Sequence, residues 1–526
     1  MLLHTRLKKN SYHDSVTLMV VSREASSREG IERAVALMGT EMNKTALREV
    51  GMLGSDLTDA CPADLMLALR GVDEGVVREA MAQVEAVLSR RGGRAGEASG
   101  RDPLVSHRTL SDAMVALPEA NLALISVPGE FAGREARRAL ESGLHVMLFS
   151  DNVPLADEKA LKEMARDRGL LVMGPDCGTA IINGIGLAFA NKVAKGSIGI
   201  IGASGTGIQE VSVQLDRLGE GVSHAIGTGG RDLAPVIGGI TMRQALRALQ
   251  SDSETRVIVL ISKPPAPDVA KQVLSLAGES PKPVVVSFLV EVPKPRDTLG
   301  VHAASTLEHA ALVAVSLLRG QKPPPPPALS DEEVRLAKAE AGKMARTQRY
   351  VRGLFAGGTL CHEAMGLLKA RLGKPVRSNL SSDPSLRLEA GERPSGHTVV
   401  DLGEDEFTRG RPHPMIDPSL RNDWILREAS NEDVAVILLD IMLGYGAHAD
   451  PAGAVAGPIA EARERAAQEG RHLSVVGYVC GSHGDEQGLA QQEARLREAG
   501  VVLLPSNASA AWFASAVAAP RGAGRE

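Results

Sequence analysis

The chain is poor in aromatic residues, which make up 2% of its 526 residues. Single-stranded nucleic acids are commonly held by stacking on aromatic side chains, and a formal net charge of −5 leaves no basic face for a phosphate backbone. We therefore expect no nucleic-acid partner. Cysteine is also scarce: Cys61, Cys177, Cys361 and Cys480 are far apart and form no CxxC pair. This favours reduced thiols over a disulfide framework or a zinc site.

Long apolar segments are missing as well. The longest runs, such as VAVILLDIML at 434–443, have about ten residues and are too short to span a bilayer. The N-terminal stretch MLLHTRLKKNSYHDS lacks the apolar core of a signal peptide. We therefore expect a cytoplasmic protein with no membrane partner.

Two nucleotide-binding signatures are absent from the sequence. The glycine-rich loop at 227–241 has no Walker lysine, which excludes a P-loop. No GxGxxG fingerprint with an acidic partner after the next strand is found either, so nicotinamide chemistry is not expected.

Short apolar runs alternate with helical patterns from about residue 104 onward. They lie at 121–127, 145–150, 169–175, 196–202, 255–262 and 283–289, and a second series lies at 350–357, 397–403, 433–443, 473–481 and 501–506. This texture predicts buried parallel strands joined by crossover helices in an α/β fold. A strand, a Gly/Thr turn and a helix recur at 199–219 and 353–373, which suggests a duplicated flavodoxin-like domain. The alternative is that two α/β units look alike without common ancestry. Between the series, KPPPPP at 322–327 predicts a stiff spacer, and SDEE at 330–333 has the spacing of a capping box.

The N-terminal region predicts a small α/β domain over 1–90, with β-rich runs at 15–22 and 64–70 and a helix at 72–88. A glycine-rich linker follows at 90–103, and RGAGRE at the C-terminus is expected to be a loose tail. The other expected domains are a Rossmann-like domain at 104–195, flavodoxin-like domains at 196–320 and 350–519, and a proline-rich linker with a helix at 321–349.

Two glycine-bearing turns have the composition of anion sites. They consist of Ser204, Gly205 and Thr206 in the first half and of Gly357, Gly358 and Thr359 in the second. Each turn is expected between a strand and a helix, where exposed amides and partial positive charge suit a phosphate or a carboxylate. The alternative is that glycine and threonine only form a tight turn and an N-cap.

The stretch GRPHPMID at 410–417 holds three candidate catalytic residues. Pro414 and the proline at 412 restrict the backbone around His413, so its imidazole is displayed with little conformational freedom. Arg411 offers a planar fork for a carboxylate or phosphate, and Asp417 is placed to orient the histidine or neutralise the guanidinium. The alternative is a rigid exposed turn with a surface salt bridge.

A second polar cluster follows the predicted strand at 433–443. Asp440, His448 and Asp450 are expected to face the same cleft and to contribute to phosphate or substrate binding, and His483 is a further candidate. These residues lack a recognised metal-ligand spacing, so no metal is expected. Helix capping and loop bracing are the alternative role of such aspartates.

Several motifs resemble known proteins. GPDCGTAI (174–181), GIIGASGTG (199–207), GTGGRD (227–232) and PVVVSFL (283–289) resemble the α subunit of succinyl-CoA synthetase, and AGGTLCHEA (356–364) resembles the glycine turn of its β subunit. DSVTLMVVS, MGTEMNK (38–44), GRPHPMID and GYGAHADPAG (444–453) are similar to the FdrA family, and the likeness spans nearly the whole chain.

This resemblance implies a CoA-ligase-like fold, in which 104–195 is a truncated CoA-binding domain and both flavodoxin-like domains sit in one chain. FdrA proteins are commonly labelled acyl-CoA synthetases. Members are also associated with oxamate carbamoyltransferase, acting with separately encoded partner subunits in anaerobic allantoin breakdown. That reaction interconverts oxalurate plus phosphate with oxamate plus carbamoyl phosphate.

The sequence departs from the ligase pattern at several places. A glycine/arginine linker precedes Ser106 where the synthetase holds CoA, and no ATP-grasp domain is present. His302 in GVHAAST lacks the glycine of the synthetase phosphohistidine context, and ISKPPAPD at 261–268 replaces the expected acidic residue. CoA is therefore the one cofactor considered, without being required, and His302 is interpreted as a strand-end residue.

We expect a cleft that binds a small carboxylate and a phosphate, acyl phosphate or carbamoyl phosphate. Helix N-termini would stabilise developing negative charge, Arg411 would clamp the substrate, and His413 would act as acid/base or hydrogen-bond donor. Carbamoyl or acyl transfer is favoured over complete ATP-driven ligation. The alternatives are a succinyl-CoA-synthetase-like ligase subunit and a non-catalytic metabolite-binding scaffold.

Overall fold

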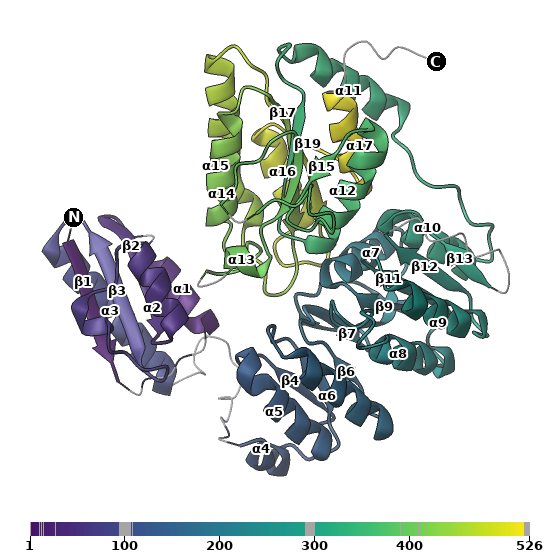
Figure 1. The fold of residues 1–526 in the computed structure, drawn as a ribbon, viewed down its shortest axis with the longest axis horizontal. Coiled ribbons are helices and arrows are strands. Elements are labelled where there is room, and N and C mark those ends of the chain that lie inside the picture. Colours follow the sequence, from purple (N-terminus) through teal and green to yellow (C-terminus); the bar gives the residue numbers. More distant parts are fainter. Residues whose placement is uncertain are drawn as a thin grey trace. The chain divides into compact units, whose positions relative to one another are not determined.

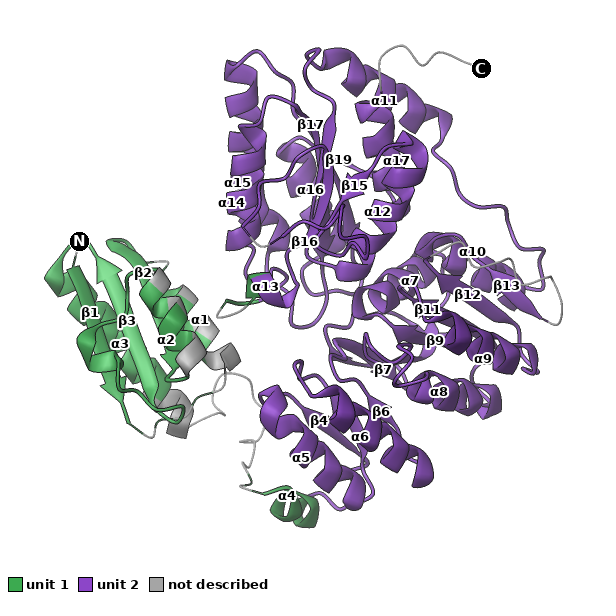
Figure 2. Cartoon of the chain, viewed as in Figure 1, with its two compact units in different colours: residues 1–116, 407–412 green, residues 117–406, 413–526 purple. Residues whose placement is uncertain are grey.

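The computed structural model (Figure 1) describes residues 2–9, 11, 13, 15–26, 28–93, 107, 109–289, 300–389, 391–408 and 411–519. Most of the linker expected at 90–103, the tail expected at 521–526, Ser106 and Gly410 lie outside the described residues. The chain divides into two compact units (Figure 2). Unit 1 comprises residues 1–116 and 407–412, and unit 2 comprises residues 117–406 and 413–526.

Unit 1 is built on a sheet of antiparallel strands. Strands β1 (Leu2–Lys8), β2 (Ile31–Met38) and β3 (Leu65–Gly71) pair in the order β1-β3-β2, and both outer strands run antiparallel to β3. The helical segments are α1 (Ser15–Ser26), α2 (Glu41–Glu49), the 3-10 turn η1 (Ser55–Leu57), α3 (Glu74–Gly93) and α4 (Leu110–Ala116). Both faces of β3 are buried, because Leu67 packs in one hydrophobic cluster with α1 and α3 and Met66 in another with α2 and η1.

The strand expected at 15–22 is wrong, since this segment is the helix α1. Its buried residues Leu18, Val21 and Ala25 recur at helical spacing and pack against β2, β3 and α3. A short apolar run fits a strand and a buried helix equally well in sequence. The structure instead forms the sheet edges from β1 and β2, neither of which the sequence analysis expected.

Unit 2 begins with a small parallel sheet, the Rossmann-like part. Its strands β4 (Leu122–Ile125), β5 (His145–Leu148) and β6 (Val172–Met173) are ordered β4-β5-β6, with helices α5 (Gly129–Glu141) and α6 (Leu155–Asp167) between them. Lys162 of α6 is fully buried and donates to Glu158 at 2.9 Å and to Asp232 at 2.8 Å. Because Asp232 belongs to the next sheet's connections, this ion pair joins the two parts.

Lobe 1, residues 179–318, contains a larger sheet. Its strands are β7 (Thr179–Ile182), β8 (Ile185–Ala188), β9 (Lys195–Ala203), β10 (Val222–Gly227), β11 (Val257–Ser262), β12 (Val284–Phe288) and β13 (Val301–Ala303), and its helices are α7 (Gly205–Arg217), α8 (Ile240–Ser251), α9 (Pro267–Gly278) and α10 (Leu307–Leu318). The strand order is β13-β12-β11-β9-β10-β7-β8. Figure 1 shows α8 and α9 on one face of this sheet and α7 and α10 on the other.

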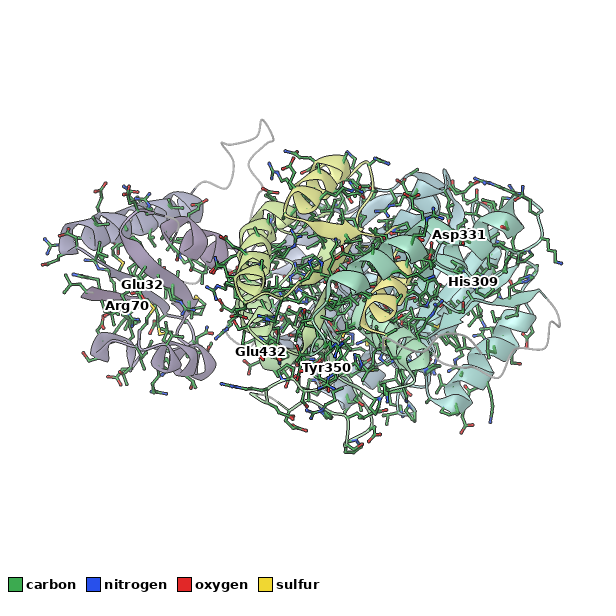
Figure 3. All side chains as sticks on the ribbon, turned by 90° about the horizontal axis from the view of Figure 1, so that it is seen from above. Glu32, Arg70, His309, Asp331, Tyr350 and Glu432 are labelled. Atoms are coloured by element: carbon green, nitrogen blue, oxygen red, sulfur yellow. The ribbon has the colours of Figure 1, made fainter. Side chains whose placement is uncertain are left out.

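Helix α11 (Asp331–Lys343) connects lobe 1 to lobe 2, which comprises residues 350–406 and 413–518 of unit 2. The capping box predicted at 330–333 is confirmed, because the Ser330 hydroxyl accepts the Glu333 amide and Glu333 accepts the Ser330 amide. Asp331 at the start of α11, His309 on α10 and Tyr350 at the start of β14 are labelled in Figure 3.

Lobe 2 repeats the architecture of lobe 1. Its strands are β14 (Tyr350–Phe355), β15 (Val376–Arg377), β16 (His397–Asp401), β17 (Val434–Met442), β18 (Ser474–Cys480) and β19 (Val501–Leu503), and its helices are α12 (Gly358–Leu372), α13 (Asp405–Thr408), α14 (Ser419–Ala429), α15 (Pro451–Gln468), α16 (Leu489–Glu498) and α17 (Asn507–Ala518). The parallel strand order is β15-β16-β14-β17-β18-β19.

The predicted α/β fold class with two flavodoxin-like lobes is confirmed. In lobe 1 the parallel strands taken in chain order are arranged 2-1-3-4-5, and lobe 2 shows the same arrangement once the short β15 is set aside. This is the flavodoxin-like order, whose switch point lies beside the first strand. Ligands are therefore expected at the carboxyl ends of β9 and β14. The two lobes also share one hydrophobic cluster, which includes Ile208 and Leu307 from lobe 1 and Leu360 and Phe513 from lobe 2.

Candidate functional site

The two glycine-bearing turns meet in the structure. Ser204 follows β9 and caps α7, because its hydroxyl accepts the Gly207 amide at 2.9 Å. The Ser204 and Thr359 hydroxyl oxygens lie 2.5 Å apart, and the Thr206 hydroxyl accepts the Thr359 amide at 3.2 Å. Side-chain hydrogen bonds therefore join the N-termini of α7 and α12, one from each lobe.

Asp440, on β17, holds the lobe 2 turn. Its carboxylate accepts the Ala356 amide at 2.8 Å and the Gly357 amide at 2.7 Å, and Arg421 donates to it at 3.1 Å. Asp440 and Arg421 are both buried. Burial raises the pKa of Asp440, and Arg421 and the two amides oppose that shift. Asp440 was predicted from the sequence to contribute to substrate binding, and in the structure its carboxylate oxygens contact the turn and Arg421.

Three partly exposed residues in the first turns of α7 and α12 carry amides without a partner. Within the described ranges, the N–H groups of Gly205, Thr206 and Gly358 have no hydrogen-bond acceptor. Such groups and the helix dipole attract negative charge. A phosphate or carboxylate between the lobes would find donors from both helices.

Lys263 brings a positive charge to the same place. It is the first residue after β11, the neighbour of β9 in the sheet, and its side chain is 38% exposed. A Cβ added at Gly358 would lie 3.2 Å from the Lys263 Nζ atom, so the ammonium of lobe 1 reaches the first turn of α12. Lys263 was not among the predicted site residues, because ISKPPAPD at 261–268 was interpreted only as the loss of an acidic residue. The available signal was its position directly after a switch-point strand.

Asp401, at the end of β16, faces the same glycine. A Cβ at Gly358 would collide with its Oδ2 atom, while Oδ1 accepts the Gly403 amide at 2.9 Å. Asp401 is 3% exposed, and burial raises the pKa of Asp401 to about 7, with Lys263 opposing the shift. This residue was also missed, because a strand-end aspartate carries no motif.

Further acidic groups surround Lys263. Glu404 lies 3.9 Å from the Lys263 ammonium. Asp176 follows β6 with a positive φ of 57°, and loss of surrounding water raises its pKa to about 7, while Lys263 lowers it and Asp151 and Glu404 raise it. The cleft therefore combines a cation and helix amides with several carboxyl groups.

His413 lies beside the end of β16. Its Nε2 atom is close to Gly403, where an added Cβ would collide with it, and its ring centroid is 6.2 Å from that of Phe189 of lobe 1. The Nδ1 atom accepts the Met415 amide at 3.2 Å, which assigns the ring hydrogen to Nε2. Burial, and the positive charge of Arg421, lower the pKa of His413 to about 4. The imidazole is thus neutral at pH 7 with Nε2–H as its donor.

The other residues of GRPHPMID are placed differently. Asp417 accepts the Ser419 amide at 3.0 Å and also contacts the Ser419 hydroxyl, so this carboxylate forms the turn that starts α14. Arg411 is exposed and belongs to segment 407–412, which is part of unit 1. The roles expected for Asp417 and Arg411 stay predictions of the sequence.

His448 and Asp450 brace the loop after β17. The His448 amide donates to the Met415 carbonyl at 2.8 Å, and the His448 Nδ1 atom accepts the Asp450 amide at 3.0 Å. Asp450 caps α15 by accepting the Gly453 amide at 3.1 Å, and it also contacts Arg495. These contacts correspond to the capping and bracing that the sequence left open as the alternative.

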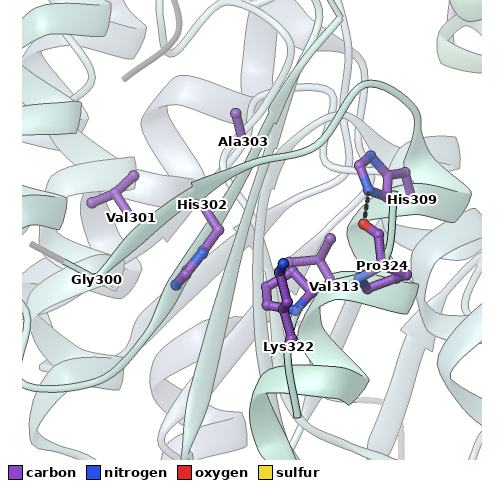
Figure 4. A pocket seen from close by; sticks show the side chains of 9 residues that line it. Gly300, Val301, His302, Ala303, His309, Val313, Lys322 and Pro324 are labelled. Carbon is purple, nitrogen blue, oxygen red and sulfur yellow. Dashed lines mark hydrogen bonds between the residues drawn. The ribbon is translucent and has the colours of Figure 1, made fainter. Parts of the chain in front are cut away.

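His302 lies away from the two turns. It is on β13, separated from β9 by β11 and β12, and it lines a cavity of about 390 Å³ with Lys322 and Pro324 (Figure 4). On the far wall, His309 Nε2 lies 3.1 Å from the Pro324 carbonyl oxygen, which ties the polyproline spacer to α10. His302 therefore does not share the amides of α7 and α12.

Three family models match the sequence. A CoA-ligase model matches residues 354–517, a CoA-binding domain model matches 193–290, and a model described as the heavy metal-associated domain of AllF matches 1–103. The protein YahF of Escherichia coli K12, described as uncharacterized, is 45% identical over 508 residues, which cover 97% of each chain. The chain belongs to the same family as YahF.

More distant relatives of this YahF family member are CoA ligases. Succinate–CoA ligase subunit alpha 2 of Archaeoglobus fulgidus is 28% identical over 205 residues, 38% of this chain and 69% of the relative. The corresponding subunit of Aquifex aeolicus is 31% identical over 150 residues, 27% of this chain and 48% of the relative. Together with the two CoA-related matches, they place the family among the succinyl-CoA synthetase-like proteins.

Two solved structures align with this chain at low TM-scores. The dinucleotide-forming acetyl-coenzyme A synthetase 1 of Ca. Korarchaeum cryptofilum, in complex with phosphate and ADP, aligns with a TM-score of 0.30 and 15% identity, over 85% of this chain and 93% of that one. The ATP citrate lyase of Methanothrix soehngenii, in complex with citrate and coenzyme A, aligns with a TM-score of 0.35 and 15% identity. The alignment covers 47% of this chain and 48% of that one.

The residues of 1–103 do not fit a heavy-metal site. Heavy-metal sites rely on thiolate ligands, and this region contains a single cysteine, the exposed Cys61. No group of three or more His, Cys, Asp and Glu residues in the described part of the chain is placed to hold a metal ion. We assign no step to a metal. Among the same residues, no helix is long and apolar enough to cross a membrane.

The phosphates of CoA are not matched by the Rossmann-like turn. In such domains a nucleotide binds at the first strand-to-helix turn, here between β4 and α5. That turn carries the acidic Glu130 and no basic side chain, and a Cβ at Gly129 would lie 2.6 Å from Asn152 backbone atoms. This turn lies outside residues 193–290, which the CoA-binding model matches, and we assign no step to CoA.

Proposed function

We propose that this chain transfers a carbamoyl or acyl group between a small carboxylate and phosphate, as an FdrA-type member of the succinyl-CoA synthetase-like proteins. Separately encoded subunits are expected to complete the enzyme, as the subunit names of its ligase relatives suggest. The single observation that carries the proposal is the hydrogen-bonded junction of two helix N-termini, with the Ser204 and Thr359 hydroxyl oxygens 2.5 Å apart.

In the proposed reaction, a phosphate oxygen forms a bond to the carbamoyl carbon of oxalurate. The bond that breaks joins that carbon to the nitrogen between the two carbonyl groups. This nitrogen leaves as the amide nitrogen of oxamate and takes up the proton released by phosphate. The products are carbamoyl phosphate and oxamate. The amides of Gly205, Thr206 and Gly358 would hold the phosphate and stabilise the negative charge that develops on the carbonyl oxygen.

His413 is the proposed donor or proton relay. Its neutral ring, with Nε2–H available, suits a group that donates without carrying charge. We expect His413→Ala to lower the rate of carbamoyl transfer about 10²–10⁴-fold. His302→Ala is the matched control, because His302 lies on β13, outside the junction.

The assay measures carbamoyl phosphate formed from oxalurate and inorganic phosphate, with the chain alone and with co-expressed neighbouring gene products. Product formation that depends on His413 and not on His302 is the expected result. Activity that disappears in His302→Ala and survives in His413→Ala would contradict the proposed site.

A second candidate function is an acyl-CoA ligase subunit, which the CoA-ligase match over 354–517 favours. This candidate predicts CoA-ester formation from succinate, ATP and CoA when a nucleotide-binding partner is supplied, with phosphate carried on His302. Mass spectrometry of the chain after incubation with ATP or acyl phosphate tests for that phosphohistidine. Failure of both reactions under all partner conditions would favour a scaffold.

A further inference from the structure

Gly358 is the point where two opposite charges from different lobes meet. A Cβ placed there would lie 3.2 Å from the Lys263 ammonium nitrogen and would collide with the Asp401 Oδ2 atom. Glycine is therefore required by the approach of these two side chains to the first turn of α12. We call the space next to Gly358 the cradle. It is lined by the Lys263 ammonium, the Asp401 carboxyl group and the Gly358 backbone amide.

The two side chains are incompletely satisfied by the protein. Asp401 is 3% exposed, and its Oδ1 atom accepts the Gly403 amide, but no described residue donates a hydrogen bond to Oδ2. The closest acid to the Lys263 ammonium is Glu404 at 3.9 Å, a distance beyond a hydrogen bond. Oδ2 faces the open side of Gly358, so a ligand N–H placed there could donate to it.

From this geometry we propose that Lys263 and Asp401 are the specificity-determining pair of the site, in which Lys263 anchors the anionic end of the substrate and Asp401 accepts an N–H of its amide end. The proposal rests on the proposed carbamoyl transfer, whose substrates carry an amide beside an anionic group. A plain dicarboxylate would place its second carboxylate against Asp401, where like charges repel. The pair thus selects amide-bearing anions over dicarboxylates.

Binding is measured by isothermal titration calorimetry on the full chain at pH 8, with oxamate, succinate and inorganic phosphate as probes. Wild-type protein is expected to bind oxamate at least tenfold more tightly than succinate. Lys263→Met is expected to weaken the binding of oxamate and of phosphate about tenfold to a hundredfold, because a charged hydrogen-bond donor is lost. Asp401→Asn is expected to reduce the oxamate preference at least tenfold, since the repulsion of succinate disappears.

Lys271 and Asp268 on α9 provide the matched control. They form an exposed pair at 3.2 Å, with side chains 79% and 89% exposed. Lys271→Met and Asp268→Asn should leave all three affinities unchanged. If Asp401→Asn fails to fold, Gly358→Ala serves instead, because its methyl group occupies the cradle. Its expected effect is loss of oxamate binding together with a lower melting temperature, because the added methyl group collides with the buried Asp401 carboxylate.

The outcomes separate this inference from the proposed function. If oxamate binding depends on Lys263 and Asp401 but no carbamoyl transfer is detected, the specificity role of the two residues is supported and the proposed function is contradicted. If carbamoyl transfer is detected, and Lys263→Met and Asp401→Asn change neither substrate binding nor kcat/KM, the specificity role of the two residues is contradicted and the proposed function is not. Wild-type protein that binds neither oxamate nor phosphate, or binds succinate as tightly as oxamate, would also overturn the pair.

Discussion

Lobe 1 and lobe 2 share one topology and differ in the charges they place on it. Gly202 on β9 and Phe355 at the end of β14 are equivalent positions, because each lies two residues before the N-cap of the following helix. In lobe 1, Gly202 pairs with Gly227 on one side and Ile261 on the other. In lobe 2, Phe355 pairs with Asp401 on one side. On its other side Leu354 pairs with Leu439, so the next residue along that strand, Asp440, lies beside Phe355. Lobe 2 therefore has two aspartates where lobe 1 has a glycine and an isoleucine.

The charge of lobe 1 appears one step further along. Lys263 is two residues beyond Ile261, and the equivalent position in lobe 2 is the buried Met442, two residues beyond Asp440. Duplication of the fold thus supplies two similar helix N-termini, while a few strand-end residues make one lobe cationic and the other acidic. This asymmetry gives a symmetric scaffold a site with two distinct ends.

The largest expected effect comes from breaking the acidic brace of lobe 2. Asp440→Ala leaves Arg421 buried without its carboxylate and leaves the Ala356 and Gly357 amides unsatisfied, so we expect a loss of about 3–5 kcal/mol in the free energy of unfolding. Urea denaturation followed by circular dichroism measures it. Ile261→Val at the equivalent position of lobe 1 should cost only about 1 kcal/mol. Equal costs would show that the brace is not specific to lobe 2.

A smaller effect is expected from the pH dependence of Asp401. Burial raises the pKa of Asp401 to about 7, above the ordinary value of about 4. The negative charges of Glu404 and Asp440 raise this pKa further, and the positive charge of Lys263 lowers it. Folding is therefore opposed by ionisation of this carboxyl: its contribution is fully favourable below about pH 4 and is lost as the pH rises through 7.

Asp401→Asn removes this titration. Between pH 5 and pH 8, the variant should gain about 2 kcal/mol of stability relative to wild type. Denaturation midpoints at both pH values measure the gain, with the exposed Asp268→Asn variant as control. A stability difference between variant and wild type that does not change with pH would contradict the assigned shift.

The smallest effect tests the bonds that join the lobes. Ser204→Ala removes the cap of α7 and the contact with the Thr359 hydroxyl, and should cost about 1–2 kcal/mol. Thr359→Val removes only the lobe 2 hydroxyl. A double-mutant cycle should give a coupling of about 0.5–1.5 kcal/mol. Strict additivity would mean that the two hydroxyls do not interact.

Much of the fold could be predicted because buried parallel strands leave uninterrupted apolar runs. The run at 255–262 corresponds to β11, the run at 433–443 to β17, and the capping box starts α11 where the pattern places it. The segment at 15–22 was misjudged because a short apolar run does not reveal whether its period is helical.

The site was predicted only in part. Both glycine-bearing turns could be recognised from local composition. Their contact joins Ser204 to Thr359, 155 residues apart in sequence, and depends on how the two sheets pack together, which no local pattern encodes. Lys263 and Asp401 are single residues at strand ends and carry no motif. Asp440 and Asp450 were recognised as polar strand-end residues, yet sequence alone does not distinguish a carboxylate that braces amides from one that meets substrate.

The central claim, one anion site shared by both lobes, is tested most directly by phosphate titration calorimetry on three glycine variants. Gly205→Pro removes the first amide of α7 at a position where proline fits a helix, Gly205→Ala keeps that amide and makes only ordinary contacts, and Gly358→Ala fills the lobe 2 cradle. We predict one phosphate per wild-type chain, about tenfold weaker binding in Gly205→Pro and Gly358→Ala, and wild-type affinity in Gly205→Ala. Two independent phosphate sites, or loss of binding from changes in one lobe only, would contradict the claim.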